Sequence, residues 1–310
     1  MNYYEALKQQ ASEVEVTPSE TSYFSEPGKE LDPRIFQGST LRNVVREAIL
    51  TLLYNHLQLG YNEPQAWTQV YLAGSGVSFS WEAHRDPADL DCLVSVDYVQ
   101  FRQSNQEYKG WSDREISAEI NQGFSNELHP RTDTFMGTFE LTFYVNVNPN
   151  IKELNPYAAY DVLSDKWVVA PKAETAINNP EWESAIERDR SMATEIIKRY
   201  ASAYEKIKNA RNDAMRINAE TALAHAVHQG TLLFEDIHKS RSNAFNPGGA
   251  GYHDYANYRW QANKQSGVVP ALKKLSGMSK EATARFSQET YGIELPDVST
   301  LIRRASTRKN

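Results

Sequence analysis

Two aspartates separated by one residue are the best candidates for chemistry in this chain. Asp89 and Asp91 open an apolar run that extends to Val96. Alternate residues of a β-strand point to the same face, so the two aspartates project together if they lie on one strand. Carboxylates this close repel each other unless cations neutralise them. Oxygen ligands of this kind suit Mg²⁺, which usually takes substrate phosphates as further ligands.

A glycine and a serine precede this pair. An apolar, β-favouring run over 68–73 ends in Gly74-Ser75, and thirteen residues separate Ser75 from Asp89. Glycine lets a phosphate approach the backbone closely, and the serine adds a hydroxyl donor. Two strands joined in this way place a small turn beside two carboxylates, which suits a metal-bound triphosphate. The alternative is an ordinary turn followed by solvated aspartates, because short motifs of this kind often occur without function.

A third carboxylate lies within a later apolar and aromatic run. Residues 139–147 predict a buried central strand, and Glu140 stands near its start between two apolar residues. An unpaired buried carboxylate is very costly, so Glu140 needs a partner there. A metal ion shared with Asp89 and Asp91 would supply one.

Together the Gly-Ser turn and the three carboxylates resemble the nucleotidyltransferase superfamily typified by DNA polymerase beta. That superfamily includes poly(A) polymerases, CCA-adding enzymes, antibiotic nucleotidyltransferases and bacterial cyclic-oligonucleotide synthases. The resemblance covers roughly residues 40–150 and departs from the commoner pattern in having Glu140 where an aspartate is usual. The chain as a whole also resembles proteins encoded by actinobacterial phages, which identifies no substrate.

The resemblance implies a two-metal transfer reaction. Asp89, Asp91 and Glu140 would hold two Mg²⁺ ions, with Mn²⁺ as an alternative. Gly74 and Ser75 would grip the β- and γ-phosphates of a nucleoside triphosphate such as ATP. One ion lowers the pKa of the acceptor hydroxyl, and both stabilise the charge of the in-line transition state. The acceptor would be an RNA 3′ end such as that of tRNA, a second nucleotide or a small molecule, and pyrophosphate would leave.

Residues 253–266 predict a helix that gathers aromatic and basic residues. Tyr255 and Arg259 lie one turn apart on it, and Lys264 follows. Relatives in the superfamily commonly stack the base on an aromatic residue and contact the triphosphate with a basic residue of the helical domain. The resemblance therefore makes these three residues nucleotide-binding candidates. A helix with an aromatic core face and solvated basic residues is an equally good interpretation.

The spacing of apolar residues predicts the helices and strands that must position these side chains. The spacing predicts a helix over 40–58, in which Ser39 or Thr40 caps the start. It also predicts strands over 68–73, 90–97 and 139–147, edge strands within 160–169, and long helices over 181–209 and 212–238. We therefore expect an α+β fold, a nucleotidyltransferase-like mixed sheet with flanking helices, followed by a helical C-terminal domain.

Composition changes along the chain predict its domains. We expect a flexible N-terminal arm over 1–32, a catalytic domain over 33–170, a helical domain over 171–296 and a basic tail over 297–310. Residues 239–310 contain 12 Lys/Arg and 5 Asp/Glu, a net charge of +7, whereas residues 1–238 carry −14. The basic segment either contacts phosphate or nucleic acid or pairs with the acidic part inside the fold.

Composition also limits the class of protein. The content of 40% hydrophobic and 11% aromatic residues is typical of a globular chain. The single cysteine, Cys92, excludes a disulfide within the chain and predicts a buried structural thiol. No signal peptide and no run of eighteen apolar residues is present, so we expect a cytoplasmic protein with no membrane partner.

Two other classes of function compete with the nucleotidyltransferase hypothesis. One is a catalytically inactive binding or antitoxin-like protein that retains the fold and works through its surface. Retention of three mutually repelling acids argues against it. The other is a metal-dependent phosphoesterase built on the Asp-x-Asp pair, which leaves Gly74-Ser75 unexplained.

Overall fold

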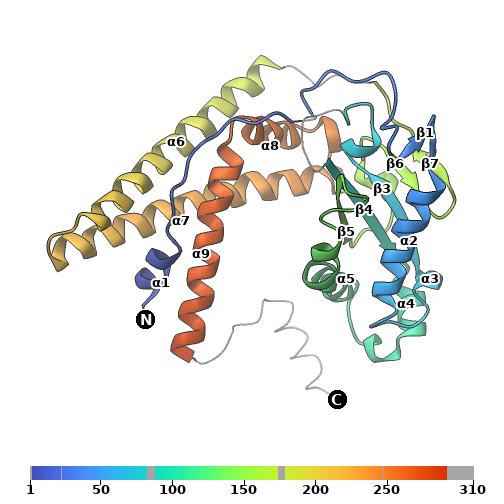
Figure 1. Ribbon diagram of the computed structural model, residues 1–310, viewed down its shortest axis with the longest axis horizontal. Coiled ribbons are helices and arrows are strands. Elements are labelled where there is room, and N and C mark those ends of the chain that lie inside the picture. The colour runs from blue at the N-terminus through green and yellow to red at the C-terminus, as the bar shows by residue number, and fades with distance from the viewer. Residues whose placement is uncertain (1, 22, 82–87, 174–178, 247, 292–310) are drawn as a thin grey trace. The chain divides into compact units, whose positions relative to one another are not determined.

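The described part of the chain forms two compact units (Figure 1). The computed structural model describes residues 2–21, 23–81, 88–173, 179–246 and 248–291. What we call the sheet unit comprises the described residues of 20–173 together with 245–252. The helical unit comprises the described residues 2–19, 179–244 and 253–291.

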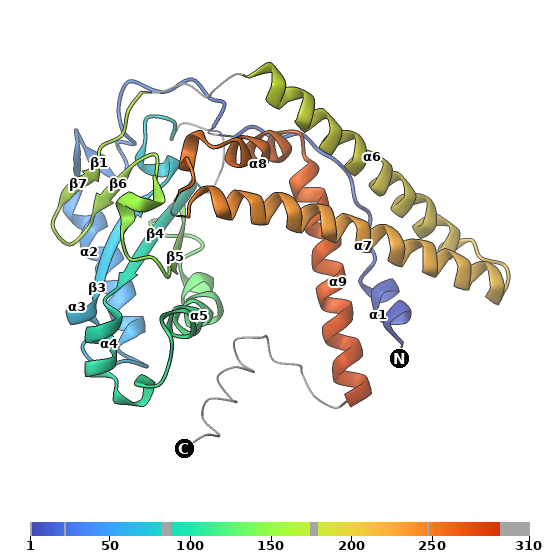
Figure 2. The same cartoon turned by 180° about the vertical axis from the view of Figure 1, so that it is seen from behind.

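A mixed sheet forms the centre of the sheet unit (Figure 2). The order of its five described strands is β5-β4-β3-β6-β7, and β5 runs parallel to β4 while the other neighbours are antiparallel. The strands are β3 (Thr68–Ala73), β4 (Ala88–Val96), β5 (Phe139–Val145), β6 (Ala159–Asp161) and β7 (Lys166–Val169). The prediction of an α+β fold with a mixed sheet is thus confirmed.

Helices cover one face of this sheet. From α2 (Asn43–Leu57), Ile49 and Leu53 are fully buried one turn apart, in the same core as Val70 and Leu72 of β3. The other helices of the unit are α3 (Pro64–Trp67), α4 (Tyr98–Ser104) and α5 (Asp113–Gly123). All of them contribute to that core through side chains at helical spacing, which include Trp67, Phe101, Ile116 and Ile120. The main core of the unit therefore lies between the sheet and these helices, and a smaller buried cluster that includes Ala73, Leu93 and Ile151 lies on the opposite face.

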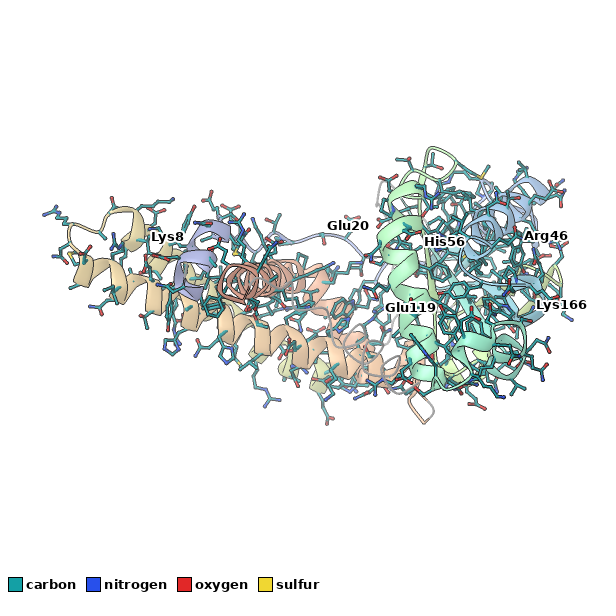
Figure 3. The ribbon with its side chains drawn as sticks, turned by 90° about the horizontal axis from the view of Figure 1, so that it is seen from below. Lys8, Glu20, Arg46, His56, Glu119 and Lys166 are labelled. Atoms are coloured by element: carbon teal, nitrogen blue, oxygen red, sulfur yellow. The ribbon has the colours of Figure 1, made fainter. Side chains whose placement is uncertain are left out.

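The start of α2 differs from its prediction. Thr40 lies in the short strand β2 (Thr40–Leu41), which pairs with β1 (Phe36–Gln37), so neither Ser39 nor Thr40 caps the helix. The residue at the cap position is Arg42, which makes no side-chain capping bond. One turn into the helix, Arg46 donates from Nε and Nη2 to the carbonyls of Val162 and Leu163, at 2.7 and 2.8 Å (Figure 3). This contact joins α2 to the turn between β6 and β7.

The prediction of a central strand over 139–147 is wrong, because β5 lies at one edge of the described sheet and is buried by side chains that cover its outer edge. Asn121 of α5 donates to the Val145 carbonyl at 2.9 Å and accepts from the Val145 N–H at 2.7 Å. Nε2 of His129 lies 2.9 Å from the carbonyl oxygen of Phe143 and 3.0 Å from its nitrogen, so it serves one of them according to its tautomer. Because an open strand edge exposes backbone donors and acceptors, these side chains take the place of a further strand.

The helical unit is built from long helices that follow the predicted stripes. Its members are α6 (Pro180–Lys208), α7 (Asp213–Ala244), α8 (Tyr255–Gln265), α9 (Val268–Tyr291) and, from the start of the chain, α1 (Tyr3–Gln10). The prediction of a helical C-terminal region is confirmed. None of the helices in the described ranges combines the length and the apolar character that a membrane crossing requires.

The start of the chain belongs to both units, where the sequence predicts one arm over 1–32. Ala6 and Leu7 of α1 are buried in the core of the helical unit, and Lys8 lies 3.6 Å from the Glu220 carboxylate (Figure 3). Tyr23 and Leu31 are buried in the sheet unit. The apolar residues of this segment are too sparse to show helical periodicity, but Ala6, Leu7 and Leu31 are each buried in a core built by distant residues. The predicted basic tail over 297–310 lies outside the described residues.

We predict that Asn121→Ala destabilises the protein by about 1–3 kcal/mol, because it leaves the N–H and carbonyl of Val145 without partners. The free energy of unfolding from urea denaturation measures the loss. Asn126→Ala is the matched control, since Asn126 is an exposed residue of the same segment. Equal effects of the two substitutions would show that the edge contact contributes nothing.

Candidate functional site

Strand alternation places the two aspartates on the face of the sheet opposite the helices. Along β4, Leu90 and Cys92 are buried in the helix-covered core, whereas Asp89 and Asp91 are half-buried. Cα atoms two residues apart on a strand lie about 6.6 Å from each other. The aspartates therefore share one face, as their spacing predicts.

The third carboxylate is brought beside them by strand register. β5 pairs with β4 so that Glu140 is the partner of Asp89 and Thr142 is the partner of Asp91. Adjacent strands lie about 4.8 Å apart, and paired residues of a parallel ladder point to the same face. The three predicted carboxylates therefore occupy neighbouring positions on one half-exposed face, which we call the carboxylate face.

The Gly-Ser turn lies against the same face. Ala73 pairs with Asp91, so the chain leaves β3 beside that carboxylate. Gly74 has φ +86° and ψ −163°, and a Cβ added to it would lie 3.2 Å from Oδ2 of Asp91. A Cβ at Gly76 would lie only 2.5 Å from the backbone oxygen of Asp89. Both glycines are needed because the turn passes so close to β4.

Asp91 is held in a defined orientation between β5 and this turn. The hydroxyl of Thr142 donates to Oδ1 of Asp91 at 3.0 Å, while Oδ2 is the oxygen nearest to Gly74. Ser75 begins a single 3₁₀ turn (Ser75–Val77), and its carbonyl accepts from the hydroxyl of Ser78 at 2.8 Å. A group seated against Gly74 would therefore meet one fixed carboxylate oxygen.

Cys92 shows the electrostatic effect of this carboxylate. Burial raises the pKa of the Cys92 thiol well above its usual value, and the negative charge of Asp91 raises it further. The thiol is free, buried and protonated at neutral pH. The prediction of a buried structural cysteine is confirmed.

The carboxylate face has the ligand type of a site for a hard divalent cation, but its described side-chain positions are not those of a formed metal site. Three carboxylates supply the oxygen ligands that Mg²⁺ prefers. Within the described ranges, however, no group of three or more His, Cys, Asp or Glu side chains is placed to hold a metal ion. The backbone register thus places the three residues side by side on one face, and the described side-chain positions do not form a metal-binding group.

Arg259 makes its observed contacts inside the helical unit. Its Nε and Nη2 donate to the two oxygens of Asp189 at 2.6 and 2.8 Å, and Nη1 donates to Asp236 at 2.8 Å. Asn263 donates to Asp189 as well, at 2.9 Å. The hydrogen bond with Asp189 raises the pKa of Arg259 above its usual range. This network joins α6, α7 and α8, so a structural role is established for Arg259, and its contact with a triphosphate stays a prediction.

The other two nucleotide-binding candidates also lie on or beside α8. The ring of Tyr255 packs edge-on against Trp182 of α6, with 5.6 Å between centroids, and burial raises the pKa of its hydroxyl. The carbonyl of Lys264 accepts from the hydroxyl of Ser19 at 3.4 Å. The ring contact of Tyr255 matches the interpretation of a helix with an aromatic core face, but Arg259 is ion-paired and not the solvated basic residue of that interpretation.

Thr142 and Gly76 are the site residues that sequence reasoning missed. Thr142 is an ordinary strand residue, and only the register shows that it meets Asp91. The sequence does contain an indication of Gly76. A second glycine two residues after Gly74 indicates a turn whose backbone comes close to a neighbouring segment at two positions.

No family model, no curated protein and no solved structure matches the chain.

We predict that Gly74→Ala lowers the free energy of unfolding by about 1–3 kcal/mol, because its backbone conformation is essentially restricted to glycine. The added methyl would also press on Oδ2 of Asp91. Thermal or urea denaturation measures the effect. Gly60→Ala is the control, since a Cβ there would meet no atom within 4 Å. A Gly74→Ala protein as stable as the Gly60→Ala protein would contradict the strained turn.

We predict that Arg259→Met destabilises the helical unit by about 3–5 kcal/mol, because it leaves the carboxylate of Asp189 buried without its cation. Adding Asp189→Asn should restore part of the loss. Urea denaturation followed by circular dichroism measures both, and Arg188→Met is the control on an exposed arginine of α6. Loss of nucleotide binding with unchanged stability would instead assign Arg259 to the ligand.

Proposed function

We propose that the protein is a metal-dependent nucleotidyltransferase that moves a nucleoside monophosphate from a nucleoside triphosphate to an acceptor hydroxyl. One observation carries the proposal. Strand register places Glu140 beside Asp89, with Asp91 on the same face and the Gly74-Ser75 turn against it. The mixed sheet, with helices on its opposite face, is the architecture that the resemblance to this superfamily implies.

The residues divide into two groups by their chemistry. Asp89, Asp91 and Glu140 would hold divalent cations, and the bound ions would lower the pKa of the acceptor hydroxyl and neutralise charge on the transferred phosphoryl group. Gly74 gives a phosphate close access to the backbone, and Ser75 provides a hydroxyl donor. Thr142 is a positioning residue, because its hydroxyl fixes one oxygen of Asp91.

The fixed orientation of Asp91 explains how the Gly74-Ser75 turn and the carboxylates would bind the same substrate. With Oδ1 engaged by Thr142, Oδ2 faces the side on which Gly74 leaves β3. A triphosphate against the turn would approach that oxygen, and like charges repel unless a cation lies between them. The geometry supports a cation shared by substrate and protein. Rotation of the half-buried Asp89 and Glu140 side chains toward Asp91 would complete the cation site.

A binding protein that retains the fold without catalysis is the second candidate. The observation in its favour is that no three acidic, histidine or cysteine side chains are grouped for a metal ion in the described part of the chain. Such a protein would work through its surface and would release no pyrophosphate. The two candidates therefore differ in a direct measurement.

The test is pyrophosphate release and label transfer from each labelled nucleoside triphosphate with Mg²⁺ or Mn²⁺, with and without total tRNA. We expect activity with at least one triphosphate. Asp89→Asn and Asp91→Asn should each reduce it by roughly a hundredfold or more, because cation sites of this kind stabilise the transition state by several kcal/mol and about 1.4 kcal/mol is tenfold in rate.

Asp133→Asn is the matched control, since Asp133 is an exposed aspartate shortly before β5. It should retain full activity. Transfer that survives the combined Asp89→Asn/Asp91→Asn substitution would reject the proposed site. Absence of turnover with every triphosphate, together with no shift of the melting temperature by Mg²⁺ and nucleotide, would favour the binding protein.

A further inference from the structure

Two exposed lysines of the helical unit share one face of α9. Lys273 and Lys280 are two helical turns apart, so they project in nearly the same direction about 10.5 Å from each other. Neither forms an ion pair within the described part of the chain. Gly277 lies between them, and a Cβ added to it would meet no atom within 4 Å. The space between the two charges is therefore open.

This part of α9 packs closely against α7. A Cβ added to Gly230 of α7 would lie 2.6 Å from Cδ1 of Leu275, which follows Lys273 on α9. Ile237 of α7 and Leu272 of α9 are fully buried in one core. The interface between the two helices thus places the C-terminal half of α7 next to the part of α9 that carries the lysines.

The charges that act on His238 of α7 join the two helices into one basic surface. Partial burial lowers the pKa of His238. The positive charges of Arg241, Lys280 and Lys273 lower this pKa further. Glu235 lies one turn before His238 on α7, yet the charges that shift the pKa are positive. Because salt screens exposed charges over short distances, these cations lie near one another. We call His238, Lys273 and Lys280 the basic surface.

Aromatic rings adjoin the basic surface. The ring of His238 stacks on Phe234 with 5.7 Å between centroids and 16° between planes, and Trp260 of α8 meets His238 in a T-shaped arrangement at 5.5 Å. His238 is exposed, whereas Phe234 and Trp260 are half-buried. Unpaired nucleic-acid bases stack on histidine and tryptophan rings, and basic side chains hold the phosphates between them. The combination of rings and cations therefore suits a strand whose bases are accessible.

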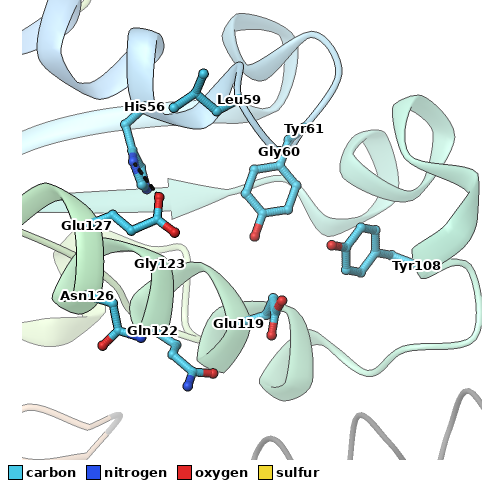
Figure 4. Close-up of a pocket in the computed structure, with 10 residues that line it drawn as sticks. All are labelled: His56, Leu59, Gly60, Tyr61, Tyr108, Glu119, Gln122, Gly123, Asn126 and Glu127. Atoms are coloured by element: carbon cyan, nitrogen blue, oxygen red, sulfur yellow. Dashed lines mark ion pairs between the residues drawn. The ribbon is translucent and has the colours of Figure 1, made fainter.

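A cavity of the sheet unit has the opposite character (Figure 4). It lies at the end of α2 and along α5, and its lining contains Glu119 and Glu127. None of its described lining residues is a lysine or arginine. This cavity offers no such cation to a phosphate, whereas the basic surface does.

We propose that the basic surface binds single-stranded nucleic acid. Lys273 and Lys280 would contact backbone phosphates on either side of the open space at Gly277, and a base would stack on the ring of His238. A duplex keeps its bases stacked on one another and away from such a ring. An acidic polypeptide would match the charges but would bring no base to the ring. The binding requires no transfer chemistry, so it goes beyond the proposed function.

The test is fluorescence anisotropy of the full chain with labelled single-stranded oligouridylate RNA and oligothymidylate DNA, without divalent metal or triphosphate. We expect saturable binding that weakens as salt rises from about 50 mM to about 200 mM, because binding releases counterions from the strand. Lys273→Gln/Lys280→Gln should weaken binding. It should also lower the slope of log affinity against log salt by about 1.4, since each phosphate contact on a single strand contributes about 0.7.

Gly277→Glu tests the open space without removing either lysine. It should weaken binding about tenfold or more, because a carboxylate between the lysines offsets their charge and repels phosphate. Gly277→Gln is the matched control, since glutamine has a similar size and helix propensity without the charge. A side chain has room at this position, so both variants should fold, which circular dichroism checks. Gly277→Gln should bind at least several times more tightly than Gly277→Glu.

Lys198→Gln/Lys206→Gln is the control for the lysine pair, because both are exposed residues of α6. It should change binding less than Lys273→Gln/Lys280→Gln does. Absence of saturable binding by both oligonucleotides would overturn the proposal. Equal weakening by the two lysine pairs, equal affinity of the two Gly277 variants, or equal affinity for a duplex or for polyglutamate would overturn it as well. Tighter binding of RNA than of DNA would support it and add a contact with the 2′-hydroxyl.

Discussion

The parallel pairing of β4 with β5 is the constraint on which the rest of the candidate site depends. In this register Asp89 is beside Glu140 and Asp91 is beside Thr142, while Leu90 and Leu141 enter the helix-covered core. Side chains alternate with a period of two, so a shift of one residue would turn carboxylates into the core and leucines to solvent. Burial of the leucines therefore determines the face of the sheet on which the alternating carboxylates lie.

Acidic side chains occupy two kinds of environment in this protein. In the helical unit, Asp189 is buried and receives hydrogen bonds from Arg259 and Asn263, which compensates for the loss of water. On the carboxylate face the three acids stay half-exposed, and Thr142 orients one of them. A buried, cation-paired carboxylate is typical of structural support, so Asp189 and Arg259 stabilise the packing of the helical unit.

The basic character of residues 239–310 has a partial explanation in the same contacts. Arg259 pairs with Asp189 and Asp236, so part of the positive charge is used within the fold. Arg241 lies over the ring of Trp260, with 5.1 Å between its Cζ and the ring centroid. Internal pairing therefore accounts for part of the positive charge of this segment, and its contact with phosphate or nucleic acid stays a prediction.

The sequence by itself determined the strand over 68–73, the long helices and most of the strand predicted over 139–147, which ends at Val145, because apolar periodicity is a local property that survives in the fold. It also named the three carboxylates and the glycine turn. Only the tertiary structure decided that Glu140 pairs with Asp89, that Thr142 holds Asp91, and that Arg259 serves Asp189. Strand register and the partner of a buried charge are relations between distant residues, and no local pattern encodes them.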